Sequence, residues 1–198
     1  MKITDLKVVF ICPNNNDFYR KRMDHMVQML NKVGFKNVVH HKSTTESYPS
    51  CLSQAFIDIL TEYIDTPILI LEDDVEFTSV DTFDYINDVD AIYFGISKSG
   101  GHSTENKEDG GCCFAPYSNS QVRILNMLTT HAILYNSKEY KTRVIEELKN
   151  NPTFHSDVII SRLQKHYKIL ANKNPSFYQS AALNTNPHSE NWTRFTLP

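Results

Sequence analysis

Four continuous apolar runs stand out along the chain, and each predicts a strand buried on both faces. They are "LKVVFIC", "PILIL", "DAIYFGIS" and "THAILYN". A continuous run lacks the polar alternation of a half-exposed strand, so these segments are expected inside a covered sheet. Shorter strands are predicted at "KNVVHH", "KILAN" and "SFYQSAA".

In the segments between these strands, apolar residues recur at the spacing that is typical of a helix. After the first strand, one helical face is predicted to hold Met23, Met26, Val27, Leu30 and Val33, and Gly34 is placed to end that helix. Further helices are predicted at "SCLSQAFIDILTEYI", at "SKEYKTRVIEELKNN" with Ser137 as N-cap, and at "HSDVIISRLQKHY" with Ser156 as N-cap. Strands that alternate with helices predict an α/β layer of mostly parallel strands, with ligand sites at the strands' carboxyl ends.

Composition narrows the class of protein. The 198 residues favour a single domain, 1–198, and the 20 Lys and Arg against 23 Asp and Glu give a net charge of −3. This balance lacks the basic footprint of a nucleic-acid-binding protein, so we expect no nucleic-acid partner. No apolar segment reaches membrane length, so no membrane span is expected. The four cysteines lack zinc-type spacing, which favours reduced thiols and a cytoplasmic location.

The main candidate functional residues lie in "PILILEDDVEF", where Glu72, Asp73 and Asp74 follow a buried strand. Like charges about 4 Å apart repel by roughly 4 kcal/mol at an effective dielectric near 20, so a partly buried acidic cluster needs a cation or protonation. Carboxylate oxygens suit Mg²⁺ or Mn²⁺, which can bridge the phosphates of a nucleotide. The alternative is a solvated acidic turn without function.

Other candidates lie around this strand. Pro13, Asn14 and Arg20 follow the first strand, where an α/β sheet binds ligands, although turn chemistry alone also explains them. The long polar segment from Lys98 to Gly111 is either disordered or a flap over the ligand. Within it, Gly111 either lets the backbone approach a donor sugar or only lets the loop turn.

The order of these segments resembles the lipopolysaccharide and procollagen type of glycosyltransferase, family 25. The resemblance comprises "VVFICPNNNDFYRKRMDHMVQMLNKVGF", "SQAFIDILTEYIDTPILILEDDVEF", "THAILYNSKEY", "HSDVIISRL" and "FYQSAAL". It covers most of the chain, and its most specific part is the Glu-Asp-Asp strand. It implies a GT-A (Rossmann-like) fold with a mixed, mostly parallel central sheet flanked by helices. It also implies transfer of a sugar from a nucleotide-sugar donor, of which UDP is the commonest type, to a saccharide or other hydroxyl acceptor.

The resemblance assigns roles to the acidic motif, which is a variant of the family's DxD signature. Glu72, Asp73 and Asp74 would handle the metal and the donor, with Asp74 as the first choice for direct metal contact. His188 in the C-terminal tail is a candidate third metal ligand, and His131 is a candidate donor-binding residue. Each histidine is otherwise an ordinary surface or core residue. The segment "CPNNND" departs from the family's usual apolar-Asn-Leu start, so the base-binding residues are not assigned by it.

Asp157 is the candidate catalytic base, because a carboxylate at a helix start is kept ionised by the helix dipole and can project into a cleft. An ordinary first-turn aspartate gives the same local pattern. Two other functions stay open. The segment "DVEFT" superficially resembles the DxDxT pattern of haloacid dehalogenase-like phosphatases, although its second acid is wrong. A non-catalytic nucleotide-binding module would also show this acidic strand.

Overall fold

A computed structural model describes residues 1–44, 48–85, 87–101, 110–180 and 182–183. The helices are α1 (Asp17–Val33), α2 (Ser50–Glu62), α3 (Lys138–Asn150) and α4 (Ser156–Gln164), with a short 3₁₀ turn at Ile3–Asp5. The strands are β1 (Lys7–Ile11), β2 (Asn37–His41), β3 (Ile68–Glu72), β4 (Val75–Phe77), β5 (Ala91–Tyr93), β6 (Ser99–Gly100), β7 (Gly110–Gly111), β8 (Cys113–Pro116), β9 (Gln121–Asn126), β10 (Ala132–Tyr135), β11 (Ile169–Asn172) and β12 (Phe177–Gln179).

The main sheet of the described chain has the strand order β2-β1-β3-β10-β5-β11-β9-β8. Strand β1 pairs in parallel with β2 and β3, and β5 pairs in parallel with β11. The pairings on both sides of β10 and of β9 are antiparallel. Following these pairings across the sheet gives six strands in one direction, with only β10 and β9 reversed. The sheet is therefore mixed and mostly parallel, as the sequence predicts.

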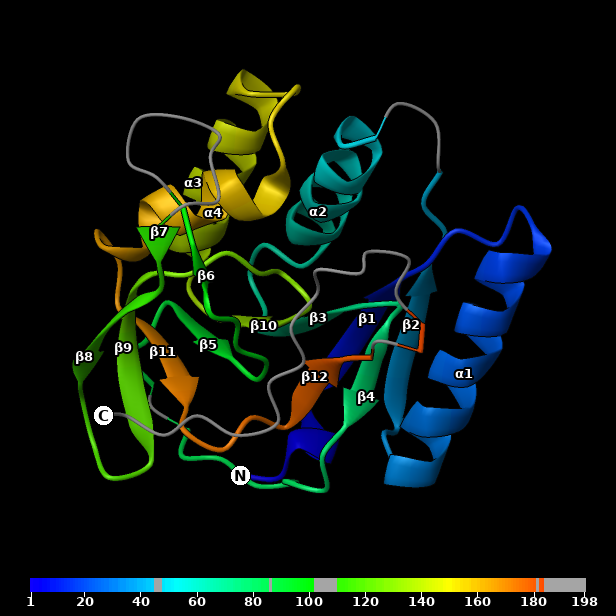
Figure 1. Cartoon of the computed structure of the whole chain (residues 1–198), viewed down its shortest axis with the longest axis horizontal. Coiled ribbons are helices and arrows are strands. Elements are labelled where there is room, and N and C mark those ends of the chain that lie inside the picture. The colour runs from blue at the N-terminus through cyan, green and yellow to red at the C-terminus, as the bar shows by residue number, and fades with distance from the viewer. Residues whose placement is uncertain (45–47, 86, 102–109, 181, 184–198) are drawn as a thin grey trace.

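Helices cover both faces of this sheet. Side chains alternate along each central strand, so Val9 and Ile70 point into a core with α2, α3 and α4, while Val8 and Leu71 point into a core with α1. Figure 1 shows α2, α3 and α4 together on one side and α1 on the other. The double covering explains why the predicted strands are continuous apolar runs rather than alternating ones.

Local signals place the helix ends. Asn16 caps α1 by accepting the backbone N–H of Tyr19, and Gly34 ends that helix with φ of +94° in the left-handed region. Ser137 caps α3 as predicted. Ser156 does not cap α4: His155 is the N-cap residue, and Ser156 is buried as the first helical residue.

Two small sheets complete the described fold. Strand β12 pairs antiparallel with β4, which carries the chain just after the acidic run, and β6 pairs with β7. The β6–β7 pairing closes the base of the segment predicted as a flap, whose central residues 102–109 lie outside the described part of the chain. The pairing of β12 with β4 brings the C-terminal part of the chain onto the end of the acidic strand.

Candidate functional site

The acidic run leaves the sheet where two parallel strands end together. Ile11 of β1 is in register with Glu72 of β3, so Cys12 and Asp73 both lie just beyond that edge. The carboxyl ends of parallel strands are where open α/β sheets bind ligands, because the loops that leave them diverge around a crevice. The predicted position of the acidic run at such an edge is therefore seen in the structure.

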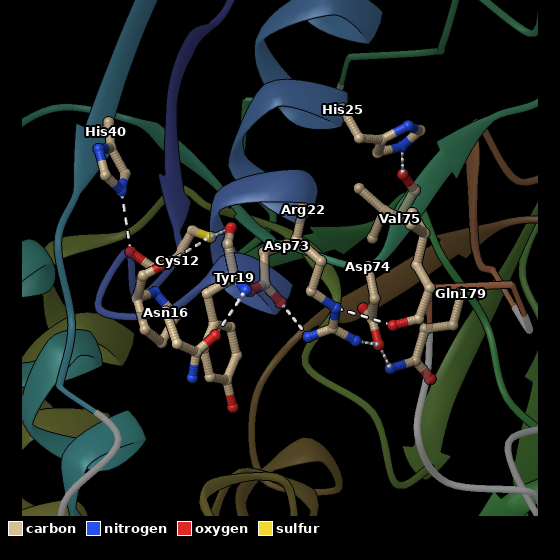
Figure 2. A network of polar contacts seen from close by, with 12 residues as sticks. Cys12, Asn16, Tyr19, Arg22, His25, His40, Asp73, Asp74, Val75 and Gln179 are labelled. Carbon is tan, nitrogen blue, oxygen red and sulfur yellow. Dashed lines mark hydrogen bonds and ion pairs between the residues drawn. The ribbon is translucent and has the colours of Figure 1, made fainter.

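Arg22 of α1 binds the second and third carboxylates of the run. Its Nη1 donates to Asp73 Oδ1 at 2.6 Å, and its Nη2 donates to Asp74 Oδ2 at 3.4 Å. All three side chains are buried, and the guanidinium also lies 5.0 Å from the ring centroid of Phe18. Figure 2 shows the guanidinium standing between the two carboxylates. The guanidinium of Arg22 therefore supplies the positive charge that Asp73 and Asp74 require.

The C-terminal segment closes over the same pair. Gln179 Nε2 donates to Asp74 Oδ2 at 3.3 Å, and the backbone N–H of Ser180 donates to the Asp74 carbonyl at 2.7 Å. The Nε of Arg22 donates to the carbonyl oxygen of Leu183 at 2.8 Å. Arg22 and Asp74 therefore join three parts of the chain that lie far apart in sequence: α1, the end of β3 and the segment after β12.

One oxygen of each carboxylate stays without a hydrogen-bond partner in the described structure. These atoms are Asp73 Oδ2 and Asp74 Oδ1, and both are buried. Burial raises the pKa of both carboxyls above the ordinary value, while the charge of Arg22 lowers it. A buried oxygen without a partner costs free energy unless a ligand, water or metal satisfies it, so these two atoms are candidate ligand contacts.

Glu72 is the last residue of β3, and Asp73 and Asp74 form the turn that follows it. The Oε1 of Glu72 accepts a hydrogen bond from the hydroxyl of Thr130. Burial raises the pKa of Glu72 well above its ordinary range, and the negative charges of Asp74 and Asp157 add to the rise. Glu72 is therefore the carboxylate of the cluster that most needs an added cation or a proton.

Asp157 lies in the first turn of α4. It is the second helical residue rather than the first, and its Oδ1 accepts the backbone N–H of Val158 at 2.8 Å. Its negative charge contributes to the raised pKa of Glu72, although the two residues belong to separate elements of the chain.

The remaining predicted donor residues are placed in different surroundings. Pro13 and Asn14 are half-buried beside the end of β1, and the Asn14 amide contacts the sulfur of Met23 at 3.9 Å. Arg20 is exposed and pairs with Asp17 on the first turn of α1. Gly111 lies in β7, where an added Cβ would meet nothing within 4 Å. Pro13 and Asn14 are thus near the acidic edge, while Arg20 is engaged at the surface.

His131 has its backbone at the site and its side chain in the core. Its carbonyl accepts the N–H of Glu72 at 3.0 Å, but its imidazole is 2% exposed and packs against Gly95. Burial lowers the pKa of His131 to about 4, so the ring is neutral at physiological pH. The ring offers no open face to a ligand in this arrangement. His188, the other predicted histidine, lies outside the described residues.

The residues fit a divalent metal only as a partial set of ligands. Within the described ranges, no group of three or more His, Cys, Asp or Glu side chains is arranged to hold a metal ion. Mg²⁺ and Mn²⁺ are nevertheless often held by one or two carboxylates plus substrate phosphates. The unpartnered Asp74 Oδ1 and the carboxylate of Glu72, two residues earlier in the same acidic run, are the candidates for such a pair.

Arg22 is the residue of the candidate site that the sequence reasoning misses. It lies on the buried face of α1 with Met26, Met29 and Leu30, at the helical spacing of that apolar stripe. A charged residue at a predicted core position is rare unless it is paired, so this placement is a readable signal. The prediction named Arg20, which differs by two positions and therefore points away from the core.

Comparison with known protein families and with curated proteins finds no match. Several solved structures are similar in fold. The nucleoside-diphosphate-sugar pyrophosphorylase from Vibrio cholerae is 16% identical, with 82% of this chain and 70% of that chain covered and a TM-score of 0.44. A UDP-glucose pyrophosphorylase solved with UDP-glucose is 11% identical, with coverages of 85% and 73% and a TM-score of 0.48.

A glycosyltransferase involved in glycosylation of the major capsid of PBCV-1 is 10% identical, with coverages of 73% and 67% and a TM-score of 0.39. At TM-scores below 0.5, these likenesses do not decide what this chain does. Within the described residues, no helix is long and apolar enough to cross a membrane.

Proposed function

We propose that this chain is a metal-dependent glycosyltransferase that moves a sugar from a nucleotide-sugar donor to a hydroxyl of a saccharide or other acceptor. The observation that carries the proposal is the buried Asp73–Asp74 pair just beyond the carboxyl end of β3, in which one oxygen of each carboxylate has no hydrogen-bond partner. Carboxylates that repel one another and resist ionisation are characteristic of functional sites, because a stable core avoids them.

The acidic run would hold the donor's diphosphate through a divalent cation. Glu72 and Asp74 Oδ1 are the proposed ligands, and the donor phosphates complete the coordination. A bound Mn²⁺ or Mg²⁺ would neutralise the diphosphate as it leaves. Arg22 fixes the direction of the Asp74 carboxylate by binding its other oxygen, so Oδ1 remains for the ligand. Pro13 and Asn14, at the end of β1, are the proposed neighbours of the nucleotide.

Asp157 is the proposed general base of an inverting transfer. A direct displacement at the anomeric carbon requires the acceptor oxygen to lose its proton as it attacks. The backbone N–H bond from Val158 and the start of α4 favour the ionised form of the Asp157 carboxylate. Asp157 belongs to α4, whereas the acidic run follows β3. A site built from two elements suits a reaction that holds two substrates side by side.

The phosphatase interpretation gains no support from the contacts of "DVEFT". Asp74 is bound by Arg22 and Gln179, whereas the hydroxyl of Thr78 donates to the carbonyl of Pro175 at 2.7 Å. A phosphatase of that type would need these two side chains free around one phosphate. We therefore propose no phosphatase activity.

Titration calorimetry with UDP tests the proposal. We expect UDP to bind in Mn²⁺ and to lose most of its affinity in EDTA, and we expect Asp74→Asn and Glu72→Gln to lose the manganese-dependent part. Asp24→Asn, at an exposed position of α1, is the matched control and should behave as the unmodified chain. Equal binding of UDP in EDTA and in manganese would contradict the metal assignment.

A panel of UDP-sugars with Mn²⁺ then tests the catalytic part. Release of UDP, slow with water and faster with an acceptor saccharide, is the expected result. Metal-dependent binding of UDP without any release of UDP from the sugars would identify a non-catalytic nucleotide-binding module instead.

A further inference from the structure

An exposed tyrosine contacts the N-cap of α4, the helix of the proposed base, and has no role in the proposed metal or base chemistry. Tyr48 precedes α2 and is 64% exposed. Among the large hydrophobic residues that the structure describes, it has the highest exposed fraction. A large aromatic ring left in water beside a functional site is typical of a ligand-contacting surface.

His155 holds this ring in place. The phenol oxygen of Tyr48 lies 3.3 Å from Nδ1 of His155, a hydrogen bond, and the two rings meet edge to face at 5.3 Å between centroids and 72° between planes. A second link lies close by, because the hydroxyl of Ser50 donates to the carbonyl of Pro152 at 2.8 Å. The ring therefore has a fixed direction although most of its surface is in water.

The position of the ring relates it to the proposed base. His155 lies two residues before Asp157 and is the N-cap of the same helix. The ring is thus linked to the N-cap of the helix that carries the proposed base.

The chemistry of such a ring selects a class of ligand. A pyranose presents one face of C–H bonds that packs against the negatively polarised face of an aromatic ring, while its hydroxyls bind neighbouring polar groups. Tyrosine suits this contact because it is large and rigid and has few rotatable bonds to order on binding. The imidazole of His155 beside it is a hydrogen-bonding partner for the hydroxyls of the sugar.

We propose that Tyr48, held by His155, is the platform on which a pyranose ring of the acceptor stacks, with the reacting hydroxyl directed toward Asp157. This inference rests on the proposed glycosyltransferase function and deepens it by naming the acceptor as a saccharide and the residue that recognises it. The ring's link to the helix of the proposed base, rather than to the end of β1, assigns it to the acceptor and not to the nucleotide.

Saturation-transfer NMR without any donor tests the platform directly. The probes are methyl α- and β-pyranosides of glucose, galactose and mannose, together with lactose and cellobiose. We expect at least one probe to bind the unmodified chain through protons on one face of the ring. Tyr48→Leu should weaken this binding by roughly 3- to 10-fold, the range of an aromatic contact. Tyr48→Phe keeps the ring and should retain most of the binding.

Tyr117→Leu is the matched control, because Tyr117 is 40% exposed and its ring lies near Lys168. It should leave the binding of sugars unchanged. Binding that Tyr48→Leu and Tyr117→Leu affect equally, or no binding of any probe by the unmodified chain, overturns the inference. Loss of UDP affinity in Tyr48→Leu also overturns it, since the ring would then stack on the nucleobase.

The same experiments separate this inference from the proposed function. Binding of a sugar that depends on Tyr48, in a chain that neither binds UDP nor releases it from UDP-sugars, supports the platform and contradicts the glycosyltransferase. Release of UDP with an acceptor KM that is the same in the unmodified chain and in Tyr48→Leu supports the glycosyltransferase and overturns the platform.

Discussion

Replacement of Glu72 by glutamine should stabilise the protein, although Glu72 lies in its candidate site. Burial and the charge of Asp74 raise the pKa of Glu72 from 4.5 to about 8. Glu72→Gln removes the charge and keeps the shape, and its side-chain oxygen can still accept the hydroxyl of Thr130. When a charged residue is retained for function at the expense of stability, its replacement by an uncharged residue of the same shape stabilises the protein.

The direction of the pH dependence follows from linkage. Because the folded pKa exceeds the unfolded one, the folded chain binds this proton more tightly, and the free energy of unfolding falls as pH rises from about 4.5 toward 8. At pH 7 the lost stability is on the order of 3 kcal/mol for a shift of this size. Since part of the Glu72 side chain remains in water, we expect Glu72→Gln to recover about 1.5 to 3 kcal/mol.

Thermal and urea unfolding between pH 4 and pH 8.5, both in EDTA so that no metal neutralises the cluster, measure this difference. For a chain of this size, the expected gain at pH 7 corresponds to a rise in Tm of roughly 3 to 12 °C. The gain should vanish near pH 4, where Glu72 is protonated in both states. Glu62→Gln, at an exposed position of α2, is the control and should change stability by less than about 0.5 kcal/mol at every pH.

Two results would refute the reasoning. A stability difference between Glu72→Gln and the unmodified chain that is the same at pH 4 and pH 8 would show that the charge is not the cause. A variant that is less stable at pH 8 would show that the ionised carboxylate is held by favourable contacts.

Three further variants test other parts of the structure. Arg22→Met should lower the free energy of unfolding by about 3 to 5 kcal/mol, because it leaves two buried carboxylates without their cation, whereas Arg20→Met at the exposed pair should cost at most about 1 kcal/mol; urea unfolding compares them. Gly95→Ala should destabilise by about 1 to 3 kcal/mol, since its Cβ would lie 1.7 Å from a packed imidazole nitrogen, while Gly111→Ala meets nothing within 4 Å and should be nearly neutral in the same assay. Asp157→Asn should lower turnover by roughly 10²- to 10⁴-fold with donor affinity within about twofold, as measured by UDP release and calorimetry, and near-normal turnover would exclude it as the base.

The sequence by itself determined the elements whose signals are local. The apolar runs gave β1, β3, β5 and β10, and the caps Gly34 and Ser137 gave the ends of α1 and α3. Because an acidic run directly after a buried strand leaves the sheet at that strand's end, the location of the candidate site was also readable. Strand β9 was missed although Val122 and Ile124 alternate with less buried residues, the period-2 pattern of a half-exposed strand.

Only the tertiary structure decided which elements meet. The antiparallel entry of β10 between β3 and β5 depends on pairings between strands far apart in the chain, which no local period encodes. The same holds for the binding of Arg22 to the Asp73–Asp74 pair. His131 shows the limit most clearly. Its carbonyl accepts the N–H of Glu72 at the end of β3, but its side chain lies in the core against Gly95, and no local pattern in the sequence indicates that direction.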